Sequence, residues 1–449
     1  MLIKKLIPKK IRNLRHLWYA WYGAIKYRQP SKKLLVIGVT GTSGKSTSVF
    51  FLRQMLEFAG YKVGSLSTID FYINGANKLN DQKMTMLGKM KTQEYLAEMV
   101  DKGCEVAIVE TTSEGQLQYR DRYIAYDFMI LTNLYPEHIE SHGSFAHYKQ
   151  AKLNIFRRAG SRKNKILKNK EIIKTAFVNS DIVETEEFLG AGNWPKKVIF
   201  GQQKTIVKFN EQFILGPVES NEYGLHFKVG EHRFDPEIYG AHNAKNILTA
   251  IAVARQFGIE WPIIQKAVLQ FKNAPGRNEF IPEAEKFGFK VIVDYAFEPK
   301  AMAGLYSVVD LLKPRRTIHV FGSTGGGRDV SRRFTVGEFI GQRADVCIVT
   351  DEDPYDDDPR KIMEDVASAV RQFDKLTAGQ AHDKQGRDGT NLFIIPERRE
   401  AIRRALHIAD VGDLVLVTGK GSEQAMCVAD GKKIPWDDRK IVREELCNL

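Results

Sequence analysis

Short apolar runs alternate with longer amphipathic stretches along most of this chain. The first runs are "LLVIGV" (34–39), "EVAIVE" (105–110) and "DFMILTNL" (127–134), and helix-like stretches separate them. Strands of a parallel sheet that helices cover on both faces have this nearly continuous apolar character. The pattern therefore predicts an α/β domain with a mostly parallel sheet, which we place at residues 34–274.

The alternation resumes in the C-terminal part of the chain. Four further apolar runs lie there: "KVIVDYA" (290–296), "RTIHVFG" (316–322), "DVCIVT" (345–350) and "DLVLVTG" (413–419). They predict a second, Rossmann-like α/β domain at residues 275–449. Within the first domain, residues 196–238 show short strands and turns instead, which predicts a β-rich insertion.

Residues 1–33 form a separate basic and aromatic segment. From Ile7 to Tyr27, large apolar residues recur at steps of three and four, so a helix would place them on one stripe. These residues are Ile11, Leu14, Leu17, Trp18, Trp21 and Ile25. Two interpretations stay open: a helix that lies on an anionic membrane surface, anchored by Trp and Tyr, or a helix that packs on its own protein or on a partner subunit.

Composition and charge narrow the class of protein. The chain has 449 residues, 43% of them apolar, which suits two or more domains. Its longest apolar runs, of about eight residues, are much shorter than the roughly 20 that cross a bilayer, and we expect a cytoplasmic protein. The net charge is +12, but residues 1–33 hold seven lysines, three arginines and no acidic residue, and the remainder is nearly neutral. A nucleic-acid partner is therefore not expected.

The stretch "GVTGTSGKST" (38–47) has the composition of a phosphate-binding loop. It follows an apolar run and precedes a helix-like stretch, so Gly41 and Gly44 would turn backbone N–H groups toward phosphate oxygens at a helix N-terminus. Lys45 would reach the terminal phosphates. The strict pattern G-x-x-x-x-G-K-[ST] is not met, because Val39 stands in place of its first glycine.

Candidate metal ligands follow this loop along the chain. Ser46 or Thr47 would hold Mg²⁺ at the start of the helix. The apolar run before Glu110 places that carboxylate at the carboxyl edge of the sheet, where it would complete a magnesium site or act as a capping or salt-bridging residue. His138 and Lys152 come next, and a single residue of either kind is normally structural or solvated.

Taken together, these motifs resemble those of the ATP-dependent Mur ligases, which build the peptide stem of peptidoglycan. The resemblance covers residues 34–449. "GVTGTSGKST" is similar to their loop G-x-T-G-T-N-G-K-T-T, and "TNLYPEHIESHG" (132–143) to N-L-x-x-D-H-L-D-x-H-G. Three more motifs agree: "GAHNAKN" (240–246) is similar to G-x-x-N-x-x-N, "PGRNEF" (275–280) to G-R-M-E, and "VIVDYAFEP" (291–299) to V-x-D-Y-A-H-x-P.

The resemblance implies a role for each matching residue. Lys45 would bind the β- and γ-phosphates of ATP, Ser46 and Glu110 one Mg²⁺ ion, and His138 a second ion. Lys152 matches the lysine that CO₂ carbamoylates in this family, which creates an anionic group that supports the second metal. The implied nucleotide-binding residues are Gly41, Thr42, Gly44, Lys45, Ser46 and Thr47 in the loop, Asn243 and Asn246 at the adenine, Asp294 at the ribose, and Arg277 at the γ-phosphate. The implied catalytic residues are Lys45, His138, Lys152 and Arg277.

The implied reaction is a peptide ligation. A substrate carboxylate attacks the γ-phosphate of ATP and becomes an acyl phosphate, while Lys45 and the metals offset the charge on the phosphoryl oxygens. An amine then attacks the activated carbonyl, and an amide, ADP and phosphate result. The phosphate loop would thus serve to activate a carboxylate.

Four C-terminal motifs favour the branch of the family that adds a diamino acid, the MurE-type ligases. They are "FGSTGGGRD" (321–329), "VTDEDPYDDDP" (349–359), "GKGSEQ" (419–424) and "IPWDDRKIVREEL" (434–446). By that match, Arg328 would pair with the carboxylate of the amino acid, and Glu423, in the motif that begins at Gly419, would hold its distal ammonium.

The second of these motifs departs from the diaminopimelate-specific ligases. Asp353 and Tyr355 stand where those enzymes have the Asn and Arg of D-N-P-R. The missing Arg leaves meso-diaminopimelate in doubt, and the acidic run suits a basic side chain such as that of lysine. For Asp356 to Asp358 a solvated acidic loop is the alternative.

Other departures concern the acceptor. "MTMLGKM" (84–90) and "TTSEG" (111–115) replace the family's T-T-x-P-D and S-S-H-A, and Phe297 replaces the His of D-Y-A-H. Only 33 residues precede the ATPase domain, so we expect the N-terminal domain that binds UDP to be absent.

Three functional hypotheses follow. The preferred one is a MurE-like ligase that joins a muropeptide to an amino acid. The second keeps the chemistry but uses an acceptor without UDP, such as a lipid-linked muropeptide or a substrate of the cyanophycin-synthetase or folylpolyglutamate-synthase type. The third is a nucleotide-binding scaffold that has lost ligation, which predicts damage at the four phosphate and metal positions, yet Lys45, Glu110, His138 and Lys152 are all intact.

Overall fold

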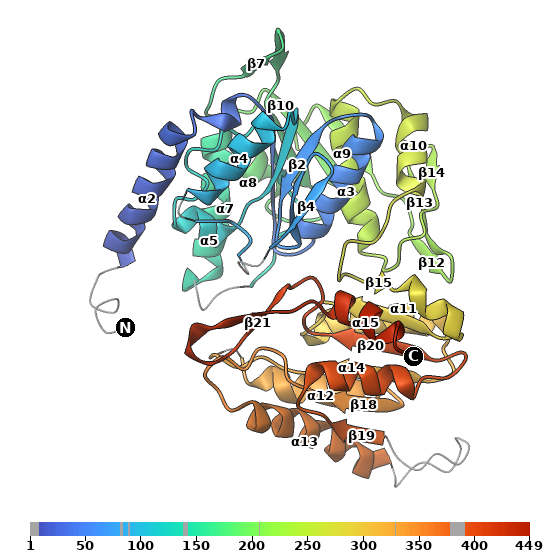
Figure 1. The fold of residues 1–449 in the computed structure, drawn as a ribbon. Helices are drawn as coiled ribbons and strands as arrows, with labels where there is room; N and C mark the ends of the chain where they lie inside the picture. Colours follow the sequence, from blue (N-terminus) through green and yellow to red (C-terminus); the bar gives the residue numbers. More distant parts are fainter. Residues whose placement is uncertain are drawn as a thin grey trace. The chain divides into compact units, whose positions relative to one another are not determined.

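The chain forms two compact units, Met1–Lys272 and Asn273–Leu449, and each is built on its own main sheet (Figure 1). The structure, a computed structural model, describes residues 9–80, 84–88, 90–137, 142–205, 207–327, 329–377 and 391–449.

The first unit has a nine-stranded sheet within its described residues, in the order β11-β10-β9-β6-β1-β5-β2-β3-β4. The pairings from β11 to β2 are parallel, and β3 and β4 extend the sheet as antiparallel strands. The strands are β1 (Leu35–Thr40), β2 (Val63–Leu66), β3 (Asp70–Ile73), β4 (Ala76–Leu79), β5 (Val106–Glu110), β6 (Phe128–Leu131), β9 (Thr175–Asn179), β10 (Lys196–Gly201) and β11 (Glu211–Ile214). Every residue of β1 is buried, because both faces of this central strand are covered.

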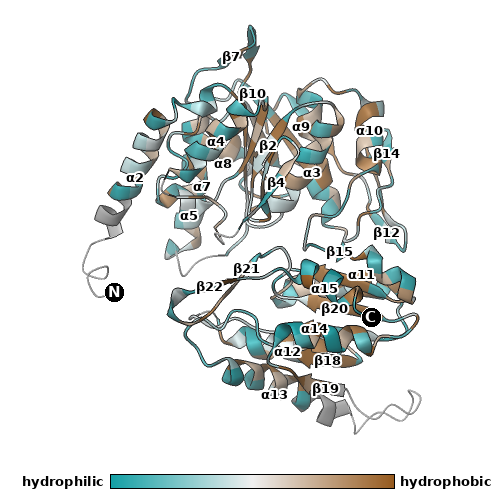
Figure 2. Cartoon of the chain, in the orientation of Figure 1, coloured by the Kyte–Doolittle hydropathy of each residue, from teal (hydrophilic) through white to brown (hydrophobic). Residues whose placement is uncertain are grey.

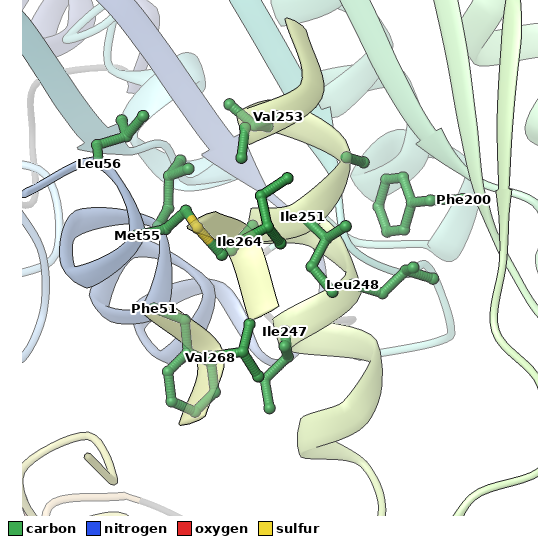
Figure 3. Packing of buried hydrophobic residues seen from close by; sticks show 14 of the residues in the cluster. Phe51, Met55, Leu56, Phe200, Ile247, Leu248, Ile251, Val253, Ile264 and Val268 are labelled. Carbon is green, nitrogen blue, oxygen red and sulfur yellow. The ribbon is translucent and has the colours of Figure 1, made fainter. Parts of the chain in front are cut away.

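Helices pack on both faces of this sheet, since successive residues of a strand point to opposite sides. Ile37 and Val39 of β1 belong to one buried apolar cluster, and Val36 belongs to another. Figure 3 shows the first cluster, in which Phe51 stands close to Ile247 and Val268. The helices of this unit are α2 (Lys9–Lys26), α3 (Lys45–Phe58), α4 (Lys91–Asp101), α5 (Ser113–Leu117), α7 (Phe145–Gly160), α8 (Thr185–Gly190), α9 (Asn243–Gln256) and α10 (Trp261–Leu269), with the 3-10 turn η1 (Pro30–Lys32).

The segment 196–238, expected as a β-rich insertion, divides between two sheets. Its first strands, β10 and β11, pair in parallel within the main sheet. The remaining strands, β12 (Glu219–Asn221), β13 (Gly224–Val229) and β14 (His232–Phe234), form a separate antiparallel sheet. The division depends on which strands pair, for example β10 with β9, which lies outside the segment. The β propensity of the segment alone does not predict such pairing. A further small hairpin joins β7 (Lys165–Leu167) to β8 (Lys170–Ile172).

The second unit has a six-stranded sheet in the order β15-β16-β20-β17-β18-β19, parallel except for the edge strand β15. Its strands are β15 (Glu279–Phe280), β16 (Lys290–Asp294), β17 (Thr317–Phe321), β18 (Val346–Val349), β19 (Asn391–Ile394) and β20 (Leu414–Thr418), and β21 (Ala425–Cys427) pairs with β22 (Lys433–Pro435). Its helices are α11 (Pro299–Leu312), α12 (Ser331–Gly341), α13 (Pro359–Thr377), α14 (Arg398–His407) and α15 (Asp438–Leu446), with the 3-10 turns η2 (Pro282–Phe287) and η3 (Ala429–Gly431). Strands β18 and β20 are hydrophobic along their length (Figure 2). The predicted α/β fold class, with a mostly parallel sheet in each half, is confirmed.

The N-terminal helix α2 lies against the rest of the first unit (Figure 1). It contacts α4 and the residues before it: a Cβ built on Gly23 would lie 2.9 Å from the Cβ of Met90, and Tyr27 OH donates a 3.2 Å hydrogen bond to Glu94 Oε2. Among the residues that the structure describes, no helix is both long enough and apolar enough to span a bilayer.

Candidate active site

The predicted phosphate loop, residues 41–44, connects β1 to α3. Gly41 and Gly44 have positive φ angles of 154° and 73°. A Cβ on Gly41 would overlap Thr132 Oγ1, and one on Gly44 would lie 2.5 Å from Asn246 Oδ1. Both positions therefore need glycine. Because α3 begins directly after the loop, the N–H groups of its first turn, which have no acceptor within the helix, form an anion-binding end.

Asn133 supports the backbone of this loop. Its Oδ1 accepts hydrogen bonds from the N–H groups of Thr42 and Ser43, at 3.0 and 2.8 Å, and its Nδ2 donates to Ser43 O at 3.1 Å. Thr132 Oγ1 donates to the same carbonyl at 2.8 Å. No role was predicted for Asn133 from the sequence, although its place in the motif "TNLYPEHIESHG", two residues after the end of β6, was a usable signal.

Ser46 and Glu110 meet at the start of α3. Glu110, the last residue of β5, is 1% exposed, and its Oε2 accepts hydrogen bonds from Ser46 Oγ at 2.9 Å, Thr68 N at 2.8 Å and Thr68 Oγ1 at 3.1 Å. Carboxylate and hydroxyl oxygens are ligands that suit Mg²⁺. Lys45 Nζ donates to Thr42 O at 2.8 Å, so this ammonium lies against its own loop, and Thr47 is half-buried in the first turn of α3.

Lys152 projects from α7 to the underside of the loop. It is 1% exposed, and its Nζ donates to Gly41 O at 2.8 Å and to Thr40 Oγ1 at 3.4 Å. The Nζ atom also lies 4.6 Å from the centroid of the Tyr148 ring. Burial, and then the charge of Lys45, lower the pKa of Lys152 well below its usual value, against the opposing charges of Glu137 and Glu110. The neutral amine of Lys152 is therefore more accessible than that of an exposed lysine.

Two predicted site residues, His138 and Arg328, lie outside the described residues. Within the part of the chain that the structure describes, no three or more His, Cys, Asp and Glu side chains gather as a metal-binding group. The described portion of the predicted magnesium site is thus the pair of Ser46 and Glu110, and Lys152 lies at the same loop.

Asn243 and Asn246, the predicted adenine contacts, lie at the start of α9. Asn243 Nδ2 donates to Tyr239 O at 2.8 Å, and Asn246 Nδ2 donates to Asn243 Oδ1 at 3.0 Å. Ser48 Oγ of α3 donates to Asn246 Oδ1 at 3.3 Å. The amide of Asn246 therefore connects α9 to the helix that carries the phosphate loop.

Arg277 and Asp294 belong to the second unit and lie around Tyr295. The guanidinium carbon of Arg277 is 4.2 Å from the centroid of the Tyr295 ring, and its Nε is buried without a hydrogen-bond partner. Both oxygens of Asp294 accept backbone N–H groups, those of Asn278 and Ala296, at 2.6 Å. Burial raises the pKa of Asp294, while Arg277 and the two hydrogen bonds oppose that shift.

Two of the predicted substrate residues of the second unit, Asp353 and Glu423, contact Lys420. This lysine is fully buried, and its Nζ lies 3.0 Å from each oxygen of Asp353 and 2.8 Å from Glu423 Oε2. Glu423 Oε1 also accepts a 3.0 Å hydrogen bond from Tyr295 OH. Lys420 had no role in the sequence-based prediction, although it lies within the motif "GKGSEQ" (419–424). Its charge offsets part of the charge of Asp353 and Glu423.

Glu352 adds a further buried carboxylate to this cluster. It is 3% exposed, burial raises its pKa to about 7, and its Oε2 has no hydrogen-bond partner. A side chain on Gly419 would overlap that oxygen. Glu352 also lines a small pocket, together with Phe297, Gly322, Ser323, Thr324, Arg332, Arg333, Val336 and Val366. The pocket combines this carboxylate with two arginines, and Phe297, which stands in place of the family's His, is one of its walls.

Tyr355 lies beside the glycine-rich loop of the same unit. It has a positive φ of 53°, its N–H donates to Cys427 O at 3.1 Å, and a Cβ on Gly326 would lie 2.7 Å from its ring. The neighbouring Asp356, Asp357 and Asp358 are exposed, and each accepts a backbone N–H, from Asp430, Gly326 and Arg360 respectively. This acidic stretch therefore accepts hydrogen bonds from one neighbouring turn and from two surface segments that are distant in sequence.

The segments predicted to face the acceptor are joined by hydrogen bonds to Glu110, a predicted metal ligand. Thr68, which donates to Glu110, shares a 2.8 Å hydrogen bond with Thr85 Oγ1 in the segment 84–88. Arg120 donates to Met86 O and to Gln118 Oε1 and so connects this segment to the end of α5. Burial lowers the pKa of Arg120.

Two domain families match the chain. Residues 39–254 match the Mur ligase middle domain, and residues 276–421 match the Mur ligase glutamate ligase domain. Among curated relatives, a UDP-N-acetylmuramyl-tripeptide synthetase of Borreliella afzelii is 29% identical over 435 residues, which cover 95% of this chain and 80% of the relative. A UDP-N-acetylmuramoyl-L-alanyl-D-glutamate--2,6-diaminopimelate ligase of Clostridium botulinum is 31% identical over 422 residues, covering 93% of this chain and 79% of the relative.

Solved structures share the fold. A UDP-N-acetylmuramoyl-L-alanyl-D-glutamate--2,6-diaminopimelate ligase aligns with a TM-score of 0.60 and 23% identity, over 97% of this chain and 83% of the other. The MurF ligase from Thermotoga maritima, solved in complex with ADP, aligns with a TM-score of 0.61 and 17% identity, over 95% and 83% of the two chains. At these identities the likeness establishes the fold.

Proposed function

This chain belongs to the Mur ligase family, and from that premise we propose that it activates a muropeptide carboxylate as an acyl phosphate and joins it to a diamino acid. The predicted enzyme class, an ATP-dependent ligase that releases ADP, is confirmed by the family membership. The observation that carries the finer proposal is the contact between Glu110 and Ser46: a buried carboxylate is held at the head of the helix that follows a glycine-rich loop.

Different residues of the chain have different roles in the proposed reaction. The N–H groups at the start of α3 and the Lys45 ammonium bind the β- and γ-phosphates, and Arg277 of the second unit binds the γ-phosphate. A carboxylate oxygen of the acceptor attacks the γ-phosphorus, and the bond to ADP breaks. The neutral amine of the amino acid then attacks the acyl carbon and loses one proton. An amide bond forms, the bond from the acyl carbon to the phosphate oxygen breaks, and inorganic phosphate, which contains the former γ-phosphoryl group, leaves.

The donor set fits Mg²⁺. Ser46 and Glu110 would hold one ion, and His138 with a carbamoylated Lys152 would hold the second. When bound, the ions neutralise negative charge on the transferred phosphoryl group. Oxygen donors around a buried carboxylate suit a hard cation, and a carboxylate as deeply buried as Glu110 gains most from a positive partner.

The environment of Lys152 supports carbamoylation. The reaction needs a neutral amine: its nitrogen forms a bond to the carbon of CO₂, one proton is released, and the product is an anionic carbamate. Burial lowers the pKa of Lys152, so the amine is available in this form. The carbamate would carry negative charge to the loop, where Lys45 is close enough to influence the same pKa.

The charges around Lys420 support a basic amino-acid substrate. Asp353, Glu423 and Glu352 contribute three carboxylates, and Lys420 contributes one ammonium. Glu423, to which the resemblance assigns the distal ammonium, is already bonded to Lys420 and Tyr295. Glu352 Oε2 has no hydrogen-bond partner, so we propose that Glu352 receives the ammonium together with Glu423. Tyr355, in place of an arginine, offers no cation to a second carboxylate. We therefore propose L-lysine or a similar diamino acid with one carboxylate.

The acceptor is proposed to be UDP-N-acetylmuramoyl-L-Ala-D-Glu, with a UDP-free or lipid-linked muropeptide as the second candidate. One observation supports the second candidate. In the segments that replace the family's acceptor motifs, Met86 packs against Gly115, and Arg120 donates a hydrogen bond to Met86 O. The non-catalytic scaffold is disfavoured, because Lys45, Glu110 and Lys152 lie together at one loop. The cytoplasmic location stays a prediction.

The test is phosphate release from ATP and Mg²⁺ with UDP-N-acetylmuramoyl-L-Ala-D-Glu, in parallel reactions that offer L-lysine, meso-diaminopimelate or ornithine. Products are identified by mass spectrometry, and Lys45→Ala is the inactive control. Turnover that depends on L-lysine or ornithine supports the proposal, and turnover only with meso-diaminopimelate overturns the proposed specificity. No turnover with any amine, from protein that still binds ATP, overturns the UDP-linked acceptor.

A further inference from the structure

The outward face of α2 carries large apolar side chains. Leu14, Trp18, Trp21, Tyr22 and Ile25 are 58%, 51%, 45%, 41% and 51% exposed. Their spacing of three and four residues puts them on one side of the helix. Trp18 and Tyr22 stack with ring centroids 5.2 Å apart. Of the stripe predicted from the sequence, Leu14, Trp18, Trp21 and Ile25 face solvent, whereas Leu17 is half-buried. Ile11, of the same stripe, has no described side chain.

The described residues of α2 that are fully buried are small. Gly23 and Ala24 are buried, and Gly23 lies directly against Met90. A helix on the surface of a globular protein normally packs its large apolar residues inward and leaves polar residues outside. In α2, by contrast, large apolar residues such as Trp18, Trp21 and Ile25 face solvent. Where α2 packs against the rest of the first unit, its most hydrophobic side has no partner in the described part of the chain. Such an exposed apolar face indicates a binding surface.

The charges of this face point to a particular partner. Arg15 and Lys26 are exposed among the aromatic residues, and residues 1–33 hold ten basic residues and no acidic one. Two copies of so basic a face would repel each other, which disfavours self-association through α2. An anionic lipid surface, by contrast, accepts both features, because cations attract its headgroups while Trp and Tyr settle at the boundary between headgroups and acyl chains.

We propose that α2 docks the protein on anionic membrane surfaces. The helix has 18 residues, about 27 Å of length at 1.5 Å per residue, and it lies in the plane of the interface. Leu14, Trp18 and Trp21 enter the boundary region, and Arg15 and Lys26 contact lipid phosphates. No described helix is apolar enough to span a bilayer, so the attachment is peripheral. The inference goes beyond the ligase activity, since it uses none of the residues of the active site.

The experiment is cosedimentation of the full chain with vesicles of equimolar phosphatidylcholine and phosphatidylglycerol, and with vesicles of phosphatidylcholine alone, without ATP or acceptor. Binding to the anionic vesicles at low salt, weakened at least about tenfold by high salt or by removal of the anionic lipid, is expected. The double variant Trp18→Ala/Trp21→Ala is expected to bind at least about tenfold more weakly. The variant Arg15→Gln/Lys26→Gln is expected to lose binding chiefly at low salt.

Matched controls come from α10. Leu269 is 62% exposed and Lys266 is exposed, so Leu269→Ala and Lys266→Gln remove one large apolar residue and one charge from another helix. Both are expected to bind vesicles like the wild type. Absence of binding at low salt overturns the proposal, as does equal loss in the α10 variants. Concentration-dependent dimerisation that Trp18→Ala/Trp21→Ala abolishes, without vesicle binding, would assign the face to a second copy. None of these outcomes bears on the ligase test.

Discussion

Lys152 Nζ donates a 2.8 Å hydrogen bond to the carbonyl oxygen of Gly41, the first residue of the phosphate loop. The bond joins α7 to the loop, and Lys152 is almost completely buried. Lys152 is therefore both a structural donor and, in the proposed reaction, the precursor of a metal-supporting carbamate. The two roles can be separated by experiment.

Replacing Lys152 by Met is expected to lower turnover at least about 100-fold, since Met cannot be carbamoylated. Folding should persist, because Met fills similar volume and removes a buried amine whose charged form is disfavoured. The matched control is Lys174→Met: Lys174 is also 1% exposed, but it donates to Tyr126 O, away from the loop. Turnover within about threefold of the wild type in Lys152→Met would remove the second-metal assignment.

Replacing Glu110 by Gln is expected to raise the Mg²⁺ concentration needed for half-maximal turnover and to lower the maximal rate about 100-fold. The reason is that a neutral amide cannot balance the charge of a bound ion. Thr68→Val serves as the control, because it removes a hydroxyl that donates to the same carboxylate but is not a proposed metal ligand. An unchanged Mg²⁺ dependence in Glu110→Gln would contradict the site.

The stability of the second unit is expected to depend on pH through Glu352. Burial raises the pKa of Glu352 to about 7, from an ordinary value of 4.5, so the folded state favours the protonated form. The stabilisation from this proton is complete below pH 4.5 and is lost as the pH rises to about 7. Above that, the buried charge costs about 3 kcal/mol relative to a neutral side chain.

Glu352→Gln is therefore expected to be more stable than the wild type near pH 8 and equally stable below about pH 4.5. Urea unfolding across this pH range measures the difference. Glu364→Gln, at a carboxylate with a 60% exposed side chain, is expected to leave the pH profile unchanged. A stability difference for Glu352→Gln that is constant between these pH values would show that burial does not shift this pKa.

The ion pair between Arg398 and Asp438 is expected to be important for the stability of the second unit. Both side chains are fully buried, at 2.7 Å, and Arg398 also donates to Thr418 O of β20. Arg398→Met should cost about 3–5 kcal/mol, because it leaves the Asp438 charge buried alone, and the double variant Arg398→Met/Asp438→Leu should recover much of that loss. Arg371→Met, at an exposed pair, should change stability by less than about 1 kcal/mol.

Replacing Tyr355 by Arg is expected to shift amine preference from L-lysine toward meso-diaminopimelate by at least about tenfold. The new guanidinium would offer two-point pairing to the second carboxylate. Tyr355→Phe keeps the ring against Gly326 and should retain the wild-type preference. Competition between the two amines, with products separated by mass, measures the ratio; a ratio that is equal in both variants would place the specificity elsewhere.

Much of the fold could be predicted because it follows from the local order of apolar, polar and turn-forming residues. The apolar runs at 34–39, 105–110 and 127–134 contain β1, β5 and β6 almost residue for residue. The order of strand, glycine-rich loop and helix was also predicted, and α3 begins at Lys45, within the predicted phosphate-loop motif. These features depend on residues that are neighbours in sequence, and so hydrophobic period and turn chemistry are sufficient to find them.

The sequence by itself thus determined the α/β class and the order of the phosphate-loop motif, because both depend on short-range spacing. Only the tertiary structure decided that β10 and β11 join the main sheet, that Asn133 supports the loop, and that Lys420 lies between Asp353 and Glu423. It also decided that the apolar stripe of α2 faces outward. Apart from the i,i+3 contact of Lys420 with Glu423, each of these depends on contacts between residues far apart in the chain. There the burial of neighbours, and not local propensity, selects the arrangement.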